Sequence, residues 1–254
     1  MNVKDGGLIE KRDRMAWLKG GTVQCNHPPA KPAGRVWRLV LLGAPGVGKG
    51  TQADLLSARL GACHLSTGDV FRAAKSLCSG EVSPAMQNAL AYMRRGDLVP
   101  DAIVLAMIAE RARCLHCGGG FLLDGFPRTV AQAEELENML GQGKVPLTAV
   151  LNYDLPTDQI VARLSGRRTC PKCKAVFHVD TRPPRVKGTC DHCGEELYQR
   201  EDDRPESIRV RMAAYEKSTR PLIDFYQKRG VLVTVPAEGS PEEIYQRTRL
   251  ALSA

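Results

Sequence analysis

A glycine-rich segment, Gly43–Thr51, contains the residue types that bind phosphate groups. It reads Gly-Ala-Pro-Gly-Val-Gly-Lys-Gly-Thr and follows a run of apolar residues. Small residues let a loop backbone approach an anion closely, and successive N–H groups then point at its oxygens. Lys49 would add a mobile positive charge that reaches the β- and γ-phosphates of a nucleotide. The segment therefore predicts a phosphate-binding loop rather than a glycine-rich turn that binds nothing.

A carboxylate at the end of a second apolar run, Phe121-Leu-Leu-Asp124, is placed to act on magnesium. Such a strand is typical of nucleotide sites, and magnesium prefers carboxylates and water, so we expect Asp124 to act through water. The alternative is that Asp124 caps the following turn. A general phosphate-binding loop has Ser or Thr directly after its lysine, whereas here Gly50 intervenes before Thr51. The pattern therefore does not by itself predict that Thr51 ligates magnesium directly.

Two CxxC pairs predict a zinc site. The pairs are separated by 16 residues and consist of Cys170, Cys173, Cys190 and Cys193. This spacing is typical of zinc ribbons, and four thiolates would leave no open position, so the metal would be structural. The alternatives are four free thiols, or His192 as a rival ligand, which we expect to be exposed. A further pair, Cys114 and Cys117, has no partner pair at suitable spacing, which favours a helix end and turn over a second metal or redox site.

The composition is that of a soluble globular protein. The chain has 254 residues, of which 43% are hydrophobic and 25% charged. No apolar run reaches the ~18 residues of a membrane helix, and the N-terminus does not resemble a secretory signal. Nine cysteines, an odd number, argue against a disulfide scaffold. We therefore expect a cytoplasmic protein without a membrane partner, and a monomer, because no surface stripe demands a partner.

The formal net charge of +8 allows three interpretations. The excess can be a solvated basic surface, a nucleic-acid-binding surface, or a set of arginines that converge on a small polyanion. No zinc-finger, basic-zipper or aromatic-interleaved sheet motif supports nucleic acid binding. The phosphate-binding loop favours the third interpretation.

Strands and helices alternate along most of the chain. The predicted strands are Val36–Leu42, Ala62–Leu65, Phe121–Leu123, Ala149–Tyr153 and Val231–Val235. The predicted helices include Thr51–Leu60, Asp101–Arg113, Thr129–Leu140, Thr157–Ser165 and Glu206–Lys217. This alternation favours an α/β fold with a five-stranded parallel sheet covered by helices on both faces. We expect a flexible extension over residues 1–35 and one domain over 36–254, interrupted by insertions at 66–99 and 166–203.

Three segments in this order resemble the motifs of the adenylate kinase family. They are Gly43–Thr51, Leu65–Arg72 (LSTGDVFR) and Asp124–Arg128 (DGFPR). The resemblance extends from about Arg38 to the C-terminus, and the cysteine pairs resemble the zinc-containing lid of one variant of the family. It implies a P-loop nucleoside triphosphatase core, a helical monophosphate-binding insertion over 66–99 and a zinc-ribbon-like lid over 166–203. It further implies reversible phosphoryl transfer from ATP to AMP, which gives two ADP.

The resemblance also implies roles for individual residues. ATP would contact Gly46, Val47, Gly48, Lys49, Gly50, Thr51, Arg163, Arg167, Val176, Phe177 and Gly239. AMP would contact Thr67, Arg72, Asp97, Leu98, Val99, Gly125, Phe126, Pro127, Arg128, Gln132, Arg200 and Arg211, with Gln132 on the adenine edge. The catalytic residues would be Lys49, Arg128, Arg163, Arg200 and Arg211, with Mg²⁺ bound to ATP and a structural Zn²⁺.

Several arginines suit this chemistry on physical grounds. Two nucleotides that meet phosphate to phosphate concentrate negative charge, and the transition state spreads it over the equatorial oxygens. The attacking phosphate oxygen is already anionic, so no general base is needed. Two other functions stay open: a kinase that uses another monophosphate or GTP, and a regulatory module that binds nucleotide without turnover. A complete set of phosphate-binding arginines favours the enzyme.

Overall fold

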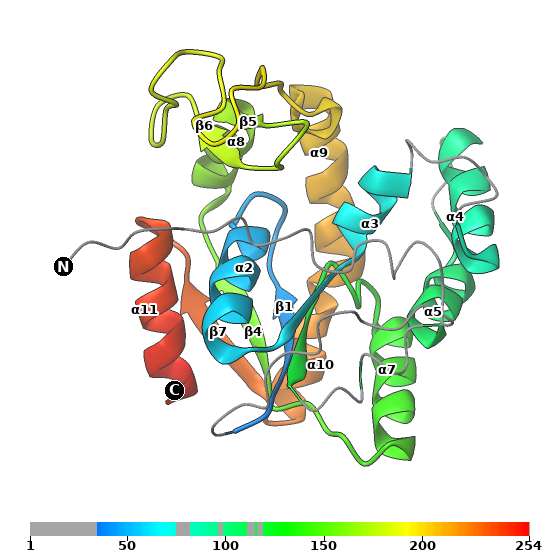
Figure 1. Ribbon diagram of the computed structural model, residues 1–254. Helices are drawn as coiled ribbons and strands as arrows, with labels where there is room; N and C mark the ends of the chain where they lie inside the picture. The colour runs from blue at the N-terminus through cyan, green and yellow to red at the C-terminus, as the bar shows by residue number, and fades with distance from the viewer. Residues whose placement is uncertain (1–34, 75–81, 96–98, 111–114, 116–118, 254) are drawn as a thin grey trace.

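The computed structural model describes residues 35–74, 82–95, 99–110, 115 and 119–253. Its centre is a five-stranded parallel sheet in the order β2-β3-β1-β4-β7 (Figure 1). The strands are β1 (Trp37–Leu42), β2 (Cys63–Ser66), β3 (Gly120–Asp124), β4 (Ala149–Asp154) and β7 (Leu232–Pro236). The prediction of a five-stranded parallel sheet is therefore confirmed. The extension expected over 1–35 lies, apart from Arg35, outside the described residues and stays a prediction.

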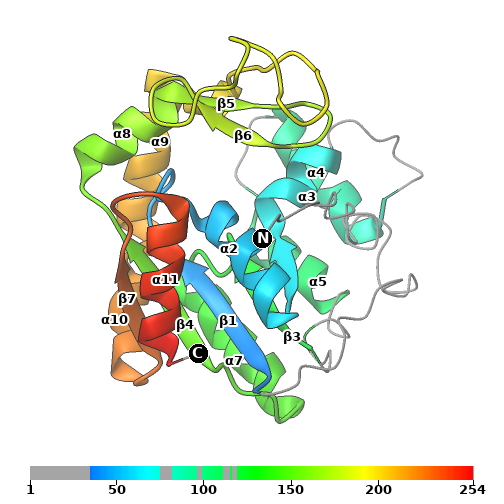
Figure 2. The ribbon, with the colours of Figure 1, turned by 60° about the vertical axis from the view of Figure 1, so that its left-hand side comes forward.

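Helices cover both faces of the sheet (Figures 1 and 2). They are α2 (Lys49–Leu60), α3 (Thr67–Ala74), α4 (Pro84–Arg95), α5 (Asp101–Ala109), α7 (Val130–Gln142), α8 (Thr157–Gly166), α9 (Pro205–Ala214), α10 (Pro221–Lys228) and α11 (Pro241–Leu252). Short 3₁₀ and π-helical turns, Glu201–Asp203 and Tyr215–Thr219, flank α9. The sequence analysis named neither α10 nor α11. Helix α11 begins at a capping box, in which the Ser240 side chain accepts from the Glu243 N–H and the Glu243 carboxylate accepts from the Ser240 N–H.

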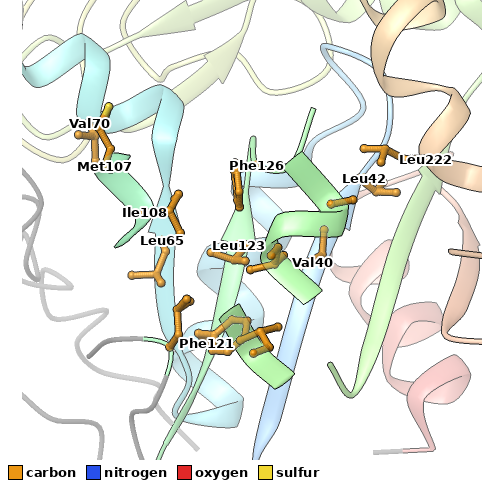
Figure 3. Packing of buried hydrophobic residues seen from close by; sticks show 14 of the residues in the cluster. Val40, Leu42, Leu65, Val70, Met107, Ile108, Phe121, Leu123, Phe126 and Leu222 are labelled. Atoms are coloured by element: carbon orange, nitrogen blue, oxygen red, sulfur yellow. The ribbon is translucent and has the colours of Figure 1, made fainter. Parts of the chain in front are cut away.

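The alternation of side chains along the strands gives the protein two hydrophobic cores. In β1, Val40 and Leu42 pack with residues of α3, α4, α5, α7 and α10, as Figure 3 shows in part. Leu39 and Leu41 point to the opposite face, where they pack with residues of α2, α8 and α11. Successive side chains of a strand point to opposite faces, so a strand buried on both sides is apolar throughout. This explains the unbroken apolar runs of the sequence.

The two insertions carry different structures. In residues 66–99 the described part is helical and consists mainly of α3 and α4. The segment 166–203 contains the short antiparallel strands β5 (Arg167–Thr169) and β6 (Val176–His178), which lie beyond the ends of α8 and α9 at the top of Figure 1. Its small core consists of Cys170, Phe177, Cys190 and Leu197. The described residues include no helix that is both long and apolar enough to cross a membrane.

Truncation of Leu123 tests the packing of the sheet. This side chain is fully buried, so Leu123→Ala should lower the free energy of unfolding by about 2–5 kcal/mol, through lost burial and the cavity left behind. Urea denaturation measures the loss. The matched control is Leu250→Ala on α11, where the leucine is 79% exposed and the change should stay below about 0.5 kcal/mol. Equal losses for the two variants would contradict the assigned packing.

Candidate functional site

The phosphate-binding loop connects β1 to α2. Gly43 and Gly46 adopt φ angles of +132° and +90°, which side chains rarely tolerate. A Cβ at Gly43 would lie 2.4 Å from the carbonyl oxygen of Tyr153, and one at Gly46 would lie 2.7 Å from the Leu164 side chain. The loop therefore passes so close to β4 and α8 that only glycine fits. The loop continues directly into α2, so its N–H groups and the N-terminus of this helix together form a favourable place for an anion.

Lys49 is the first residue of α2, and its ammonium group folds back over the loop. Its Nζ donates hydrogen bonds to the carbonyl oxygens of Gly43 and Ala44, at 2.7 and 2.9 Å. Burial lowers the pKa of Lys49, Asp124 opposes this shift and the positive charges of Arg128, Arg211 and Arg167 add to it, so that the pKa falls to about 8. These four charged residues come from distant segments of the sequence. The structure therefore gathers them near the lysine.

Asp124 ends β3 beside the phosphate-binding loop. It pairs in register with Leu41 of β1, and a Cβ at Gly50 would lie 3.7 Å from its Oδ2. The carboxylate thus lies beside the phosphate-binding loop, and its predicted role toward magnesium stays a prediction.

His64, which the sequence analysis did not single out, bridges two carboxylates. Its Nε2 lies 3.6 Å from Oδ2 of Asp124 and its Nδ1 lies 3.1 Å from Oδ1 of Asp54. Burial lowers the pKa of His64, but the contacts with Asp124 and Asp54 outweigh burial and raise the pKa to about 9. A His-Leu-Ser run gives no sign of this role, because the partners lie on α2 and β3.

The predicted AMP residues meet next to Asp124. Thr67, which is buried, donates from Oγ1 to the carbonyl oxygen of Gly125 at 3.0 Å. Arg128 donates from Nε to the same oxygen at 2.8 Å, and its backbone N–H donates to Oε1 of Gln132 at 2.7 Å. The exposed Arg128 can therefore face a ligand while its backbone is held in place.

The remaining predicted AMP residues fall into three groups. Phe126 and Pro127 are buried behind the cluster, and Val99 packs against the hydrophobic core. Arg72 lies on α3, but its side chain is outside the described part of the chain, as are Asp97 and Leu98. Arg200 and Arg211 bond to residues next to the lid, and their predicted contacts with AMP stay predictions.

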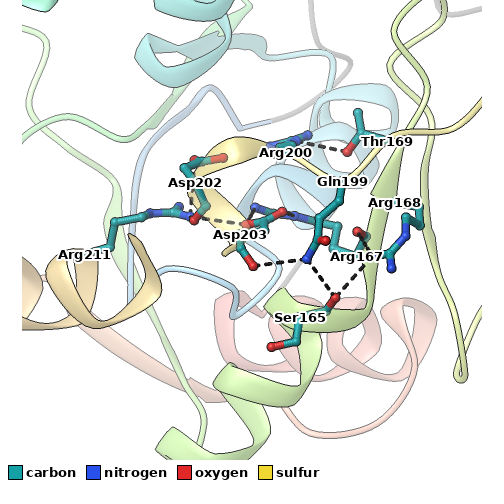
Figure 4. A network of polar contacts seen from close by, with 9 residues as sticks. All are labelled: Ser165, Arg167, Arg168, Thr169, Gln199, Arg200, Asp202, Asp203 and Arg211. Carbon is teal, nitrogen blue, oxygen red and sulfur yellow. Dashed lines mark hydrogen bonds and ion pairs between the residues drawn. The ribbon is translucent and has the colours of Figure 1, made fainter. Parts of the chain in front are cut away.

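Two arginines next to the lid, Arg167 and Arg211, form hydrogen bonds to one buried aspartate, Asp203 (Figure 4). Asp203 is fully buried, and it accepts two hydrogen bonds from Arg167, at 2.7 and 2.5 Å, and one from Arg211 at 3.3 Å. Arg200 donates to Oγ1 of Thr169 on β5 at 2.9 Å. Two planar guanidinium groups are thus oriented by one carboxylate, which is a geometry that arginine suits and lysine does not.

Arg163, on α8, connects the loop to the last strand. Its Nη2 donates hydrogen bonds to the carbonyl oxygens of Ala237 and Gly239, at 2.8 and 3.4 Å. Its Nη1 donates to the carbonyl oxygen of Val47 in the loop, at 3.4 Å. Gly239, which was predicted to contact ATP, therefore lies close to the phosphate-binding loop.

Of the predicted pair on β6, Val176 is half-buried, whereas Phe177 packs into the core of the lid. In this arrangement the Phe177 ring is buried in the lid and is not exposed to a ligand. The predicted contacts of Val176, Phe177 and Gly239 with ATP stay predictions.

The four lid cysteines form a cluster suited to zinc. Their Sγ atoms all lie within 4.8 Å of one another, with 3.4 Å between Cys170 and Cys193 and between Cys173 and Cys190. Such closeness of four sulfurs, two of them from buried residues, fits a tetrahedral thiolate site. His192 is exposed and is not part of the cluster. The predicted Cys114–Cys117 pair lies outside the described residues.

The parallel sheet, the glycine loop at the end of β1 and the acid at the end of β3 define a P-loop nucleotide-binding protein. The adenylate kinase family model matches residues 41–231. A curated relative named adenylate kinase, from Thermodesulfovibrio yellowstonii, is 50% identical to this chain; the match covers 82% of this chain and 95% of the relative. A second, from Carboxydothermus hydrogenoformans, is 45% identical, and the match covers 85% of this chain and 99% of the relative. Another, from Streptomyces avermitilis, is 47% identical over 85% of this chain and 96% of its own length. The chain belongs to the adenylate kinase family, as the motifs predicted.

The lowered pKa of Lys49 predicts a pH-dependent affinity for ATP. Phosphate binding favours the charged ammonium, so affinity should fall as pH rises through about 8 and the free lysine loses its proton. Between about pH 7 and pH 9.5 the dissociation constant should rise roughly tenfold or more, since each pH unit above the pKa removes nine-tenths of the charged form. Calorimetric titration at each pH measures this rise.

The control is Lys49→Arg, which stays charged over this range and should show a nearly flat profile. A constant affinity in the unsubstituted protein would contradict the assigned role of Lys49. An equally steep fall in Lys49→Arg would assign the titration to another group, of which His64 is the nearest candidate, with its pKa of about 9.

Proposed function

We propose that this protein catalyses reversible phosphoryl transfer from ATP to AMP, which gives two ADP. The observation that carries the proposal is the convergence of positive charge on the phosphate-binding loop. Arg128, Arg167 and Arg211 each lower the pKa of Lys49 on α2, although they come from the turn after β3, the lid and α9. A binder of one nucleotide needs the loop and its lysine, whereas two nucleotides that meet at their phosphates need charge from several sides.

The adjacent cluster of Thr67, Gly125, Arg128 and Gln132 supports a second nucleotide site. It lies at the carboxyl ends of β2 and β3, next to the end of β1 from which the loop starts. A phosphate held by Arg128 would therefore lie close to the γ-phosphate of ATP on the loop. The relatives that share 45–50% of their residues with this chain carry the name adenylate kinase, which agrees with AMP as the second substrate.

The residues act by positioning and by neutralising charge. The loop and Lys49 would hold the β- and γ-phosphates of ATP, and Arg128 the phosphate of AMP. Arg163, Arg167, Arg200 and Arg211 would then surround the transferring group with fixed donors. No side chain has to remove a proton, because the attacking oxygen is anionic at neutral pH. The remaining requirement is to exclude water, which otherwise accepts the phosphoryl group.

Two metals fit this function. Mg²⁺ bound with ATP would neutralise phosphate charge, and Asp124 would hold its water ligands. The four lid cysteines would hold Zn²⁺, which supplies no chemistry in a closed thiolate site and stabilises the fold of the lid instead. Residues 166–203 have a small apolar core, so a metal would contribute much of their stability. The assignment of 66–99 as the monophosphate-binding insertion, a monomeric state and a cytoplasmic location belong to the same proposal.

The substrate assignment is tested by the formation of nucleoside diphosphate from ATP and each of AMP, GMP, CMP and UMP. We expect kcat/KM for AMP to exceed the others by at least ~10-fold, since one mismatched hydrogen bond at the base edge suffices for that difference. Arg128→Met is the control for contaminating activity and should lower turnover at least ~100-fold, because the loose transition state loses a charge. Equal use of AMP and any other monophosphate would sink the assignment.

The zinc proposal is tested by a lid variant, Cys170→Ser together with Cys173→Ser. Elemental analysis should find about one zinc per chain in the unsubstituted protein and none in the variant. The variant should melt at a lower temperature yet bind ATP, because the loop belongs to the sheet. The control is Ser253→Ala, a change at an exposed position far from the cysteines in sequence, which should leave the metal content unaltered. Absence of zinc from the unsubstituted protein, or unchanged melting after its loss, would refute the proposal.

A further inference from the structure

A carboxylate outside the predicted nucleotide-binding residues holds the side chain expected to read the adenine base. Asp101 is the first residue of α5, which packs against α7. Its Oδ1 accepts a hydrogen bond from Nε2 of Gln132 at 2.7 Å, and its Oδ2 accepts one from Oγ1 of Thr129 at 2.7 Å. The Gln132 side chain lies between Asp101 and the backbone N–H of Arg128, which donates to Oε1 at 2.7 Å.

These two contacts determine which way the amide of Gln132 points. A backbone N–H can only donate a hydrogen bond, and a carboxylate can only accept one. Turning the amide over would set its NH₂ against the Arg128 N–H and its oxygen against the Asp101 carboxylate. Gln132 is only 3% exposed, so water cannot relieve either mismatch. The orientation is therefore fixed by chemistry on both sides.

A fixed amide presents a fixed pattern to a ligand. The hydrogen bonds among the described residues use one of its two N–H groups and one of the two lone pairs on its oxygen. These two bonds leave one N–H group and one lone pair of the Gln132 amide for a ligand. Adenine presents an amino donor next to a ring acceptor, whereas a 6-oxopurine presents an acceptor next to a ring donor. An amide held one way complements only one of these edges, and an amide free to turn over would complement both.

We propose that Asp101 is a specificity-determining residue, which locks the amide of Gln132 so that the site accepts a 6-aminopurine monophosphate and rejects a 6-oxopurine monophosphate. This rests on the proposed function, since Gln132 is taken as the residue that contacts the base of AMP. Asp101 acts through Gln132 and is therefore a positioning residue. Thr129 donates to the second oxygen of Asp101, Oδ2, and so takes no part in the bond between Oδ1 and Gln132.

The test replaces Asp101 by a residue that can face either orientation of the amide. The amide of Asp101→Asn can accept or donate, so the variant removes one of the two constraints on the Gln132 amide and leaves only the Arg128 N–H to oppose its turning over. The ratio of kcat/KM for inosine monophosphate to that for AMP, with ATP as donor, should rise at least ~10-fold. Thr129→Val is the matched control. It removes the contact to Asp101 and the cap of α7 but leaves the Asp101–Gln132 bond, so it should melt lower with a ratio within about twofold of the unsubstituted protein.

A ratio within about twofold of the unsubstituted protein in folded Asp101→Asn would overturn the proposal, as would an equal rise in Thr129→Val. Should Asp101→Asn fail to fold, Asp101→Ser gives the same readout, because serine suits a helix start and its hydroxyl can donate or accept. The activity of the unsubstituted protein with AMP distinguishes failure of the proposed function from failure of the assignment of Asp101. Failure to phosphorylate AMP there would defeat the proposed function, whereas activity with AMP and an unchanged ratio would defeat only the assignment of Asp101.

Discussion

The gathering of like charges around the phosphate-binding loop is the constraint on which the rest of the structure depends. Burial disfavours the charge of Lys49, and the positive charges of Arg128, Arg211 and Arg167 add repulsion, which is why the pKa of the lysine falls. Asp124 beside the loop opposes this shift, and the fully buried Asp203 beside the lid accepts hydrogen bonds from Arg167 and Arg211. Phosphates entering the site would supply negative charge where it is deficient. The protein thus holds a charge arrangement that a polyphosphate completes.

The parallel sheet allows this arrangement. The carboxyl ends of β2, β3 and β1 lie side by side, so Thr67, Asp124 and the glycine loop meet although they are far apart in sequence. Ligands of open parallel sheets bind at this edge. Both faces of the sheet are buried by helices, and the site is therefore built on a rigid base, while the lid and α3–α5 are attached around it.

Sequence reasoning succeeded where a signal is local. The loop glycines, the CxxC pairs and the apolar strands each carry their information within a few residues, and the structure confirms the fold class, the family and the cysteine cluster. The order of the strands follows from packing between distant segments and was not predicted. Helices α10 and α11 were not named, although both begin at proline.

The residues that sequence reasoning missed act through partners distant in the chain. His64 matters because Asp54 and Asp124 lie on either side of it, and Asp203 because two arginines reach it. Asp101 appears only as an acid at the start of a helix until Gln132 is seen to bond to it. Pairing of this kind depends on the tertiary fold. No local sequence pattern predicts which of these distant residues form pairs.

The central claim is that two nucleotides bind at once, with their phosphates meeting over the loop. The most direct measurement is calorimetric titration with a molecule in which two adenosines are joined through five phosphates, which spans both sites. One molecule should bind per chain, far more tightly than ATP or AMP alone, because the two halves are linked. Binding of two molecules per chain, or binding no tighter than that of ATP, would contradict the claim.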